Sequence, residues 1–260
     1  MARYSNKKSN SFKSKIKILL ILILLCSITL IIKIKYTENK ENKIQREISQ
    51  LLNTIEIPEE DITNEKTERQ LKIEKLQESN KDIIGWIEIV GTNINYPVLQ
   101  GEDNDYYLNH EYSHKKISSG SIFLDKDYDF NIPSANLLIY GHRNKEGLMF
   151  EDLIKYKKED YYNDHKQIRF TTKNQDMTFE IIAAFNSKVY YQNETNVFRY
   201  YNFVNTNSQK EYEDYINNCK NASLYDTGKT AIYGEKLLTL STCDYSQKNG
   251  RFAVVAKEVK

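Results

Sequence analysis

Eight short β-rich runs, each bounded by turn residues, follow residue 80 and constrain the fold of this chain more than any other feature. The predicted strands are residues 84–90, 93–98, 120–124, 136–140, 167–171, 178–186, 236–242 and 252–257. Two predicted helices lie among them, at residues 146–156 and 209–218. Many strands with few helices predict a mainly β fold that closes, or nearly closes, into a barrel, because closure removes exposed strand edges.

A reactive cysteine is predicted at the end of one of these strands. Residues 239–243 read Thr-Leu-Ser-Thr-Cys, and Arg251 follows Cys243 eight positions later, where the next strand begins. The thiolate is the nucleophilic form of cysteine, and a nearby guanidinium favours it. The short connection favours neighbouring antiparallel strands, with both side chains at one end of the barrel. The pair fits an acyl-transfer site, although a lone cysteine is often a small buried apolar residue.

A histidine follows another apolar strand, because residues 136–142 read Asn-Leu-Leu-Ile-Tyr-Gly-His. By itself, His142 is better explained as a cap of the turn after the glycine. Arg251 by itself is compatible with a rim residue paired with Asp244 or Glu258. Together with the cysteine, the two residues supply what acyl transfer at a peptide carbonyl needs: a nucleophile, a proton donor and positive charge where the oxyanion forms.

These segments, in this order, resemble the sortase family of cysteine transpeptidases. Three further details resemble the class B sortases: Gly-Ser-Ile-Phe-Leu-Asp at residues 120–125, Met149-Phe150 after the histidine, and a long insert between residues 188 and 236. The resemblance covers roughly residues 80–260. It implies an eight-stranded sortase-type β-barrel with amino-terminal helices and a helix-containing insert before the strand that carries the cysteine.

The resemblance also implies roles for the three polar residues. Cys243 is the expected nucleophile and forms a thioester with a sorting peptide. His142 is expected to protonate the departing amine and then to accept a proton from the incoming amine. Arg251 is expected to hold the oxyanion and to orient the peptide, since its guanidinium stays charged at any working pH.

Substrate contacts are expected around these residues. The backbone N–H of Asp244, the residue after the nucleophile, is a candidate second oxyanion donor. The segment 190–220 is expected to form the wall that reads the sorting motif. The resemblance implies that Asn104, Leu108, Ser241 and Thr242 contact the substrate, and Asp244 completes the set of expected substrate-binding residues.

A membrane anchor is predicted near the amino terminus. Residues 18–32 are apolar or hydroxylic throughout, and the span reaches 16–34 if Lys17 and Lys33 extend their ammonium groups toward the headgroups. A cleaved signal peptide and a buried core helix are the alternatives, but residues 29–35 offer no small-residue cleavage site. The excess of Lys and Arg before the span predicts a cytoplasmic tail at 1–15 and an extracellular catalytic domain.

The segment between anchor and barrel is highly charged and has apolar residues at helical spacing, interrupted by Pro58. Residues 35–80 are therefore predicted to be a helical stalk or helices packed on the domain; the resemblance implies that 63–79 cover the barrel. Residues 81–260 are the predicted catalytic barrel. From residue 38 onward, 29 basic side chains stand against 36 acidic ones, which argues against nucleic-acid binding.

The remaining cysteines and histidines predict neither disulfides nor a metal site. Cys26 lies in the predicted anchor, and Cys219 in a predicted helix is expected to be structural and inert. His110 and His114 are four apart, as in some zinc sites, but no third ligand follows at a clear spacing. The tyrosine pairs at 106–107, 161–162, 190–191 and 200–201 are predicted to be packing residues. No cofactor is expected.

The resemblance implies a membrane-anchored class B sortase. Such an enzyme cleaves a carboxy-terminal sorting motif of secreted proteins and joins the new acyl end to a peptidoglycan amine. Three alternatives stay open on the sequence: a pilus-polymerising sortase that uses a pilin lysine, a non-catalytic membrane-tethered peptide-binding domain, and a plain cysteine hydrolase.

Overall fold

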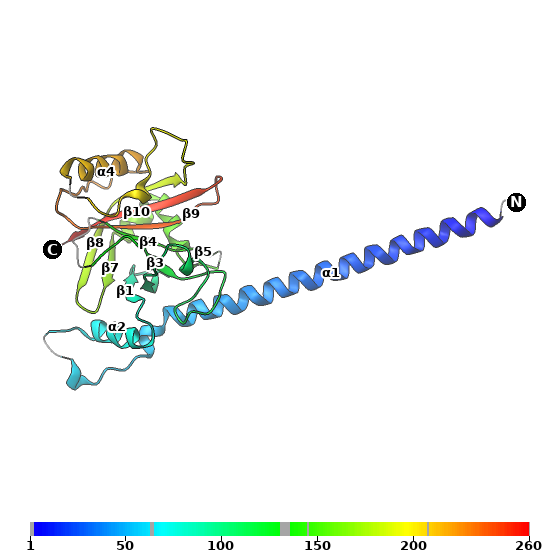
Figure 1. The fold of residues 1–260 in the computed structure, drawn as a ribbon, viewed down its shortest axis with the longest axis horizontal. Helices are drawn as coiled ribbons and strands as arrows, with labels where there is room; N and C mark the ends of the chain where they lie inside the picture. The colour runs from blue at the N-terminus through cyan, green and yellow to red at the C-terminus, as the bar shows by residue number, and fades with distance from the viewer. Residues whose placement is uncertain (1–2, 63–64, 131–135, 145, 207, 260) are drawn as a thin grey trace. The chain divides into compact units, whose positions relative to one another are not determined.

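The computed structural model describes residues 3–62, 65–130, 136–144, 146–206 and 208–259. The chain divides into two compact units, Met1–Ile44 and Gln45–Lys260. The described residues of the first unit belong to helix α1 (Arg3–Ser49), whose last residues, from Gln45, belong to the second unit (Figure 1). Its part from Phe12 to Ser49 is long and apolar enough to cross a membrane, and the predicted span 16–34 lies within it.

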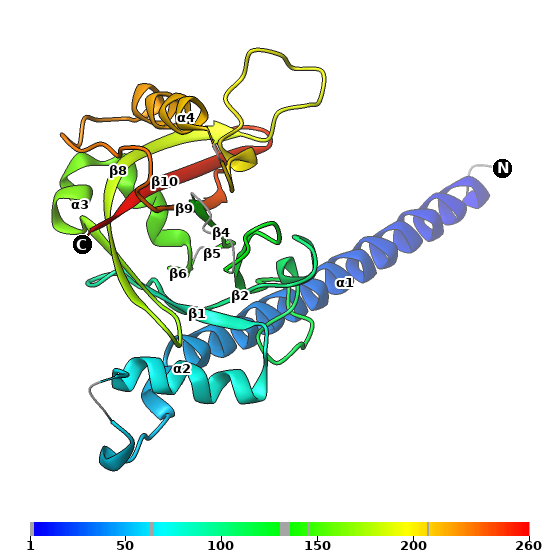
Figure 2. The same cartoon turned by 60° about the vertical axis from the view of Figure 1, so that its left-hand side comes forward.

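Eight strands of the described chain close into a barrel, as predicted (Figure 2). Around the barrel the order is β1-β2-β3-β4-β9-β10-β8-β7. The strands are β1 (Ile83–Glu88), β2 (Asn95–Leu99), β3 (Ile122–Leu124), β4 (Asn136–Tyr140), β7 (Gln167–Thr171), β8 (Asp176–Lys188), β9 (Leu237–Cys243) and β10 (Gly250–Val259). The strands carry large side chains without solvent exposure, among them Trp86, Phe170, Phe179, Phe185 and Phe252.

The predicted helix at residues 146–156 is only partly correct. Residues Leu148–Met149 form a short strand, β6, which pairs with β5 (Arg143–Asn144). A 3₁₀ helix, η4 (Glu151–Lys157), follows. Positive φ angles of 76° at Gly147 and 57° at Met149 are incompatible with a continuous α-helix. The helix α3 (Glu159–Asp164) comes directly after η4.

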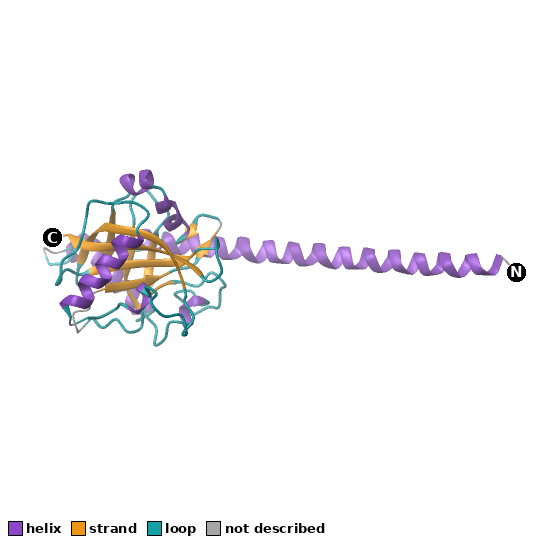
Figure 3. Cartoon of the chain, turned by 90° about the horizontal axis from the view of Figure 1, so that it is seen from above, coloured by secondary structure: helices purple, strands orange, loops and turns teal. Residues whose placement is uncertain are grey.

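The helix predicted at residues 209–218 is present as α4 (Gln209–Ala222). The hydroxyl of Ser208 accepts a hydrogen bond from the backbone N–H of Glu211 and caps the first turn. Tyr212, Tyr215 and Ile216 lie on its buried face. The helix packs against β8 and covers one face of the barrel (Figure 3).

The second cover is amino-terminal. It comprises the 3₁₀ helix η1 (Leu51–Thr54) and the helix α2 (Glu68–Ser79); the exposed 3₁₀ helix η2 (Glu59–Asp61) lies in the connection between them. Thr67 and Gln70 form a reciprocal capping box at the start of α2. The apolar face of the cover packs on the barrel in one cluster: Leu52, Ile73, Leu76, Ile83, Trp86, Leu99, Tyr107 and Phe123. Of the cover expected at 63–79, residues 63–64 lie outside the described residues.

The cover should contribute to the stability of the barrel. Ile73 has no solvent exposure, so Ile73→Ala should lower the free energy of unfolding by about 2–5 kcal/mol, through lost apolar burial and the cavity left behind. Urea unfolding followed by circular dichroism measures the change, with exposed Lys75→Ala as the control. Equal midpoints for the two variants would show that α2 does not belong to the cooperative core.

Candidate active site

The site is built at one end of β9, between two neighbouring strands. Strand β4 runs parallel to β9, with Tyr140 paired to Ser241. Strand β10 runs antiparallel on the other side, with Arg251 directly opposite Cys243. The short connection from β9 to β10 therefore makes the antiparallel pair expected from the sequence. The residue that follows β4 by two positions, His142, emerges at the same end of the sheet as Cys243.

Backbone contacts fix the turn that carries His142. The N–H of Gly141 donates to the carbonyl of Ser241 at 3.1 Å, and the hydroxyl of Thr242 donates to the carbonyl of Gly141 at 2.8 Å. A Cβ at Gly141 would lie 2.6 Å from the ring of Phe150, so only glycine allows this close packing. The N–H of Phe150 in turn donates to the carbonyl of His142 at 3.0 Å.

The imidazole of His142 has a defined partner. Its Nε2 lies 2.8 Å from the backbone carbonyl of Leu108, in the 3₁₀ turn η3 (Tyr106–Leu108). Because a carbonyl only accepts hydrogen bonds, Nε2 carries a proton in this arrangement. Nδ1 is then the ring nitrogen left for proton exchange.

Arg251 is half-buried beside the cysteine. Its guanidinium donates to the carbonyl of Gly250 at 3.0 Å. The two carboxylates considered as rim partners contact lysines: Asp244 pairs with Lys157 at 2.6 Å, and Glu258 lies 3.9 Å from a lysine. The guanidinium of Arg251 lines the pocket, and these two carboxylates pair with lysines instead.

One pocket of about 440 Å³ joins these groups, a volume in the range of small-ligand and peptide sites. It brings Cys243, His142 and Arg251 together, as expected. Four of the five residues expected to contact substrate also line it: Asn104, Leu108, Ser241 and Thr242. Its other lining residues are Asp105, Phe123, Tyr140, Gly141, Val189, Tyr200 and Tyr201.

Comparison with known proteins gives the family. A family model described as Sortase domain matches residues 87–259. Sortase B of Listeria monocytogenes is 35% identical over 199 residues, covering 76% of this chain and 78% of that protein. Sortase B of Staphylococcus aureus is 33% identical over 193 residues, covering 73% and 75%. The solved structure of sortase B from Bacillus anthracis superposes with a TM-score of 0.72 at 31% identity, over 86% of this chain and 99% of that chain.

The chain belongs to the class B sortases. Sortases are cysteine transpeptidases, so the prediction of an enzyme of this type is confirmed, as are the class and the barrel. A substrate complex of Staphylococcus aureus sortase B has the same fold, with a TM-score of 0.68 at 27% identity over 88% of this chain and 99% of that chain.

Asp244 does not have the place expected for it in this sortase. Its backbone N–H donates to the carbonyl of Gly250 at 3.0 Å and closes the β9–β10 connection. Its carboxylate, 2% exposed, accepts from Lys157 at 2.6 Å and from Ser246 at 3.0 Å. Asp244 is not among the residues that line the pocket. The expectation of a second oxyanion donor at Asp244 is therefore corrected: this N–H and carboxylate hold the loop after Cys243.

Asn104 lines the pocket, and its side-chain amide is hydrogen-bonded within the protein. Its Nδ2 donates to Asp125 at 3.0 Å, and its Oδ1 accepts from the backbone N–H of Lys126 at 2.9 Å. The same carboxylate accepts from the hydroxyl of Tyr140 at 2.8 Å. Asp125 is 3% exposed, so this buried acid orients two side chains of the pocket wall. The sequence drew attention to Asp125 only as part of a family motif.

Two tyrosines of the insert, whose segment 190–220 was expected to form a substrate-reading wall, line the pocket, although their pair was predicted to be packing residues. Tyr200, in the 3₁₀ turn η5 (Tyr200–Asn202), is buried and lines the pocket together with Tyr201. Its hydroxyl lies 2.7 Å from that of Ser241. Burial raises the pKa of Tyr200 to about 12, so it is a neutral hydrogen-bonding group at working pH. A paired-tyrosine pattern does not distinguish packing from pocket lining, because one ring does both.

The histidines considered for a metal site contact a tyrosine. The ring of Tyr106 stacks on His110 with centroids 4.1 Å apart, and the Tyr106 hydroxyl lies 3.3 Å from Nδ1 of His114. His165 lies elsewhere, with its Nδ1 3.1 Å from the carbonyl of Val90.

The two cysteines of the catalytic unit differ in accessibility. Cys243 is half-exposed and lines the pocket, whereas Cys219 in α4 has no exposure and burial raises its pKa. Iodoacetamide should therefore alkylate Cys243 in the folded protein and spare Cys219 until urea unfolds the chain. Peptide mass spectrometry in a Cys26→Ser background separates the sites. Equal labelling of both residues under native conditions would contradict the burial of Cys219.

The ion pair between Asp244 and Lys157 should be pH-dependent. Burial disfavours the charged form of Asp244, but hydrogen bonds from Lys157 and Ser246 outweigh burial and hold the pKa of its carboxyl below the usual value. The resulting stabilisation is complete above the unfolded-state pKa of about 4 and is lost as the pH falls through the folded-state value.

Lys157→Met should therefore lower the free energy of unfolding at neutral pH by about 2 kcal/mol, because a buried carboxylate loses its cation. The difference from wild type should shrink at about pH 3. Urea unfolding at the two pH values measures it, with exposed Lys158→Met as the matched control. A loss that is independent of pH would assign the effect to packing of the lysine chain.

Proposed function

We propose that this class B sortase cleaves a sorting peptide through a thioester on Cys243 and transfers the acyl group to an amine. The observation that carries the proposal is the strand register, which sets Arg251 opposite Cys243 and brings His142 to the same pocket. These three side chains supply a nucleophile, a proton carrier and a fixed positive charge around one cavity.

In the first half-reaction, Sγ of Cys243 attacks the carbonyl carbon of the scissile amide. Negative charge develops on the carbonyl oxygen, and Arg251 stabilises it through its guanidinium. The C–N bond then breaks, and protonated His142 gives its proton to the departing amine, which leaves a thioester and a neutral imidazole.

In the second half-reaction, an incoming amine attacks the thioester carbonyl. The neutral imidazole of His142 takes the proton of that amine, and Sγ leaves as the C–S bond breaks. Water competes with the amine for the same thioester. The held amide of Asn104, together with Leu108, Ser241 and Thr242, is proposed to contact the peptide along the pocket wall.

The acceptor is proposed to be a peptidoglycan amine, and the peptide a carboxy-terminal sorting motif of secreted proteins. Helix α1 supports a single-pass anchor, since its part from Phe12 to Ser49 is apolar enough to span a bilayer. The Lys and Arg residues before the apolar run favour an amino terminus inside the cell. That orientation delivers the catalytic unit to the cell surface, where both substrates would meet it.

Cys243→Ala should lower peptide cleavage by about 10³-fold or more, because no thioester can form. The full-length protein in detergent is incubated with a library of sorting-type peptides, and the acyl-enzyme is trapped for mass spectrometry. Cys219→Ala, which removes a buried thiol remote from the pocket, is the control and should retain cleavage. Cleavage by Cys243→Ala at the wild-type rate would overturn the mechanism. A thioester that reacts with a pilin lysine in preference to a peptidoglycan amine would change the proposed acceptor.

A further inference from the structure

The η3 turn connects the amino-terminal cover with the catalytic histidine. Its two last residues face different parts of the structure. Tyr107 has no solvent exposure and packs in the cover–barrel cluster with Ile73 and Leu76. The carbonyl of the next residue, Leu108, accepts the hydrogen bond from Nε2 of His142. A displacement of this turn would therefore move the hydrogen-bond acceptor of the His142 imidazole.

On the cover side, a hydroxyl holds the turn. Tyr107 donates to Oδ2 of Asp82 at 2.6 Å, and Asp82 lies in the connection between α2 and β1. The side chain of Asn80, the residue that ends α2, reaches the same hydroxyl at 3.5 Å and the carbonyl of Tyr112 at 2.6 Å. Asn80 also accepts from the backbone N–H of Asp82 at 2.8 Å. The end of α2 and the η3 turn thus form one hydrogen-bonded unit.

On the opposite side, the turn rests on a glycine. Gly120 has a φ of 55°, and a Cβ there would clash with the carbonyls of Tyr107 and Leu108. The N–H of Ser121 donates to the carbonyl of Tyr107 at 2.9 Å. Gln45, 1% exposed, donates to the carbonyl of Gly120 at 2.8 Å. The backbone of η3 is therefore confined on this side as well.

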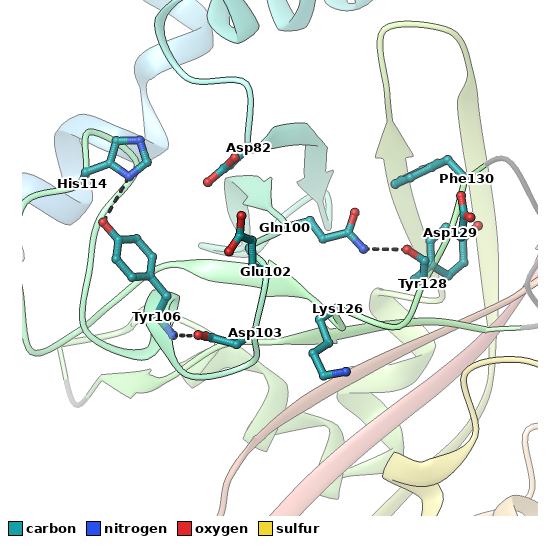
Figure 4. Close-up of a pocket in the computed structure, with 11 residues that line it drawn as sticks. Asp82, Gln100, Glu102, Asp103, Tyr106, His114, Lys126, Tyr128, Asp129 and Phe130 are labelled. Carbon is teal, nitrogen blue, oxygen red and sulfur yellow. Dashed lines mark hydrogen bonds between the residues drawn. The ribbon is translucent and has the colours of Figure 1, made fainter.

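The start of the turn is capped by a carboxylate (Figure 4). Oδ1 of Asp103 accepts from the backbone N–H groups of Tyr106 at 2.7 Å and Asp105 at 2.8 Å. These hydrogen bonds lower the pKa of the Asp103 carboxyl. Asp103 and Asp82 both line an open pocket of about 750 Å³ on the outer side of the turn.

We propose that the η3 turn, held by the Tyr107–Asp82 hydrogen bond, is a positioning device that keeps the proton of neutral His142 on Nε2. Nδ1 is then the nitrogen that exchanges protons with substrate. In the first half-reaction the Nδ1–H bond breaks as the departing amine takes the proton, and the ring becomes neutral while Nε2 keeps its own. The incoming amine returns a proton to Nδ1. This inference rests on the proposed role of His142.

Tyr107 is thus a positioning residue, since it acts through the turn and not on the substrate. If the turn moved, Nε2 would lose its acceptor and neutral His142 would populate both tautomers. Molecules with the proton on the wrong nitrogen could not receive one from the incoming amine. Small misplacements of a catalytic group can cost as much as about 100-fold in rate.

The test compares Tyr107→Phe with Tyr212→Phe in the full-length chain in detergent. Tyr212 of α4 is the matched control, because it is 1% exposed and its hydroxyl donates a hydrogen bond of 2.8 Å to the carbonyl of Glu235, outside the η3 turn. Tyr107→Phe should reduce kcat about tenfold or more with little change in KM. Tyr212→Phe should leave kcat within about twofold, whatever either variant does to Tm.

Nitrogen-15 NMR of histidine-labelled protein provides a readout that does not depend on turnover. The signals of His142 are assigned by their loss in His142→Gln. In wild type at high pH, Nε2 should be the protonated nitrogen; in Tyr107→Phe both nitrogens should have averaged shifts. Asp82→Asn, which keeps an acceptor oxygen, should retain the wild-type tautomer, whereas Asp82→Ala should not.

Two outcomes would overturn the proposal: an Nδ1–H tautomer in wild type, or a Tyr107→Phe variant with wild-type kcat and tautomer. Failure of the proposed function looks different. In that case wild type itself would form no acyl-enzyme with any peptide, while the tautomer measurement would remain interpretable.

Discussion

The position of β9 between β4 and β10 is the constraint on which the site depends. Backbone hydrogen bonding on both sides of this strand fixes the relative positions of the strand ends at which Cys243, His142 and Arg251 lie. Because side chains alternate along a strand, a slip of one residue in either pairing would turn one group to the opposite face. The site is therefore as well defined as the barrel, and no separate scaffold has to bring the three groups together.

Buried polar contacts join strand β9 to the insert. The hydroxyl of Ser241 meets that of Tyr200 at 2.7 Å, and Thr239 meets Tyr215 of α4 at 3.0 Å. Thr239 also donates to Asn136 of β4 at 2.8 Å. Each of these groups has a partner, so burial does not leave a polar atom unsatisfied. The pocket wall formed by the insert and the strand that carries the cysteine are thereby coupled.

Sequence patterns revealed the barrel strands because each is a short apolar run bounded by turns, and the nine-position span from Cys243 to Arg251 is local enough to predict antiparallel pairing. The parallel pairing of β4 with β9 joins Tyr140 to Ser241, and no local pattern encodes so distant a register. Asp244 was misassigned because a rule about the residue after a nucleophile ignores where its N–H is already bonded. The hydrogen bond between His142 and the carbonyl of Leu108 could not be predicted from the sequence, because every residue has a backbone carbonyl.

The composition of the pocket wall bears on the role proposed for Arg251 at the oxyanion. Burial raises the pKa values of Tyr140 and Tyr200, so both hydroxyls remain neutral. Asp125 is close by, but its carboxylate is occupied by Asn104 and the Tyr140 hydroxyl. The neutral hydroxyls of Tyr140 and Tyr200 do not cancel the charge of Arg251, and an ionic interaction is stronger in partly buried surroundings than in bulk solvent. Tyr140 and Tyr200 therefore contribute to the electrostatics of the site by staying uncharged.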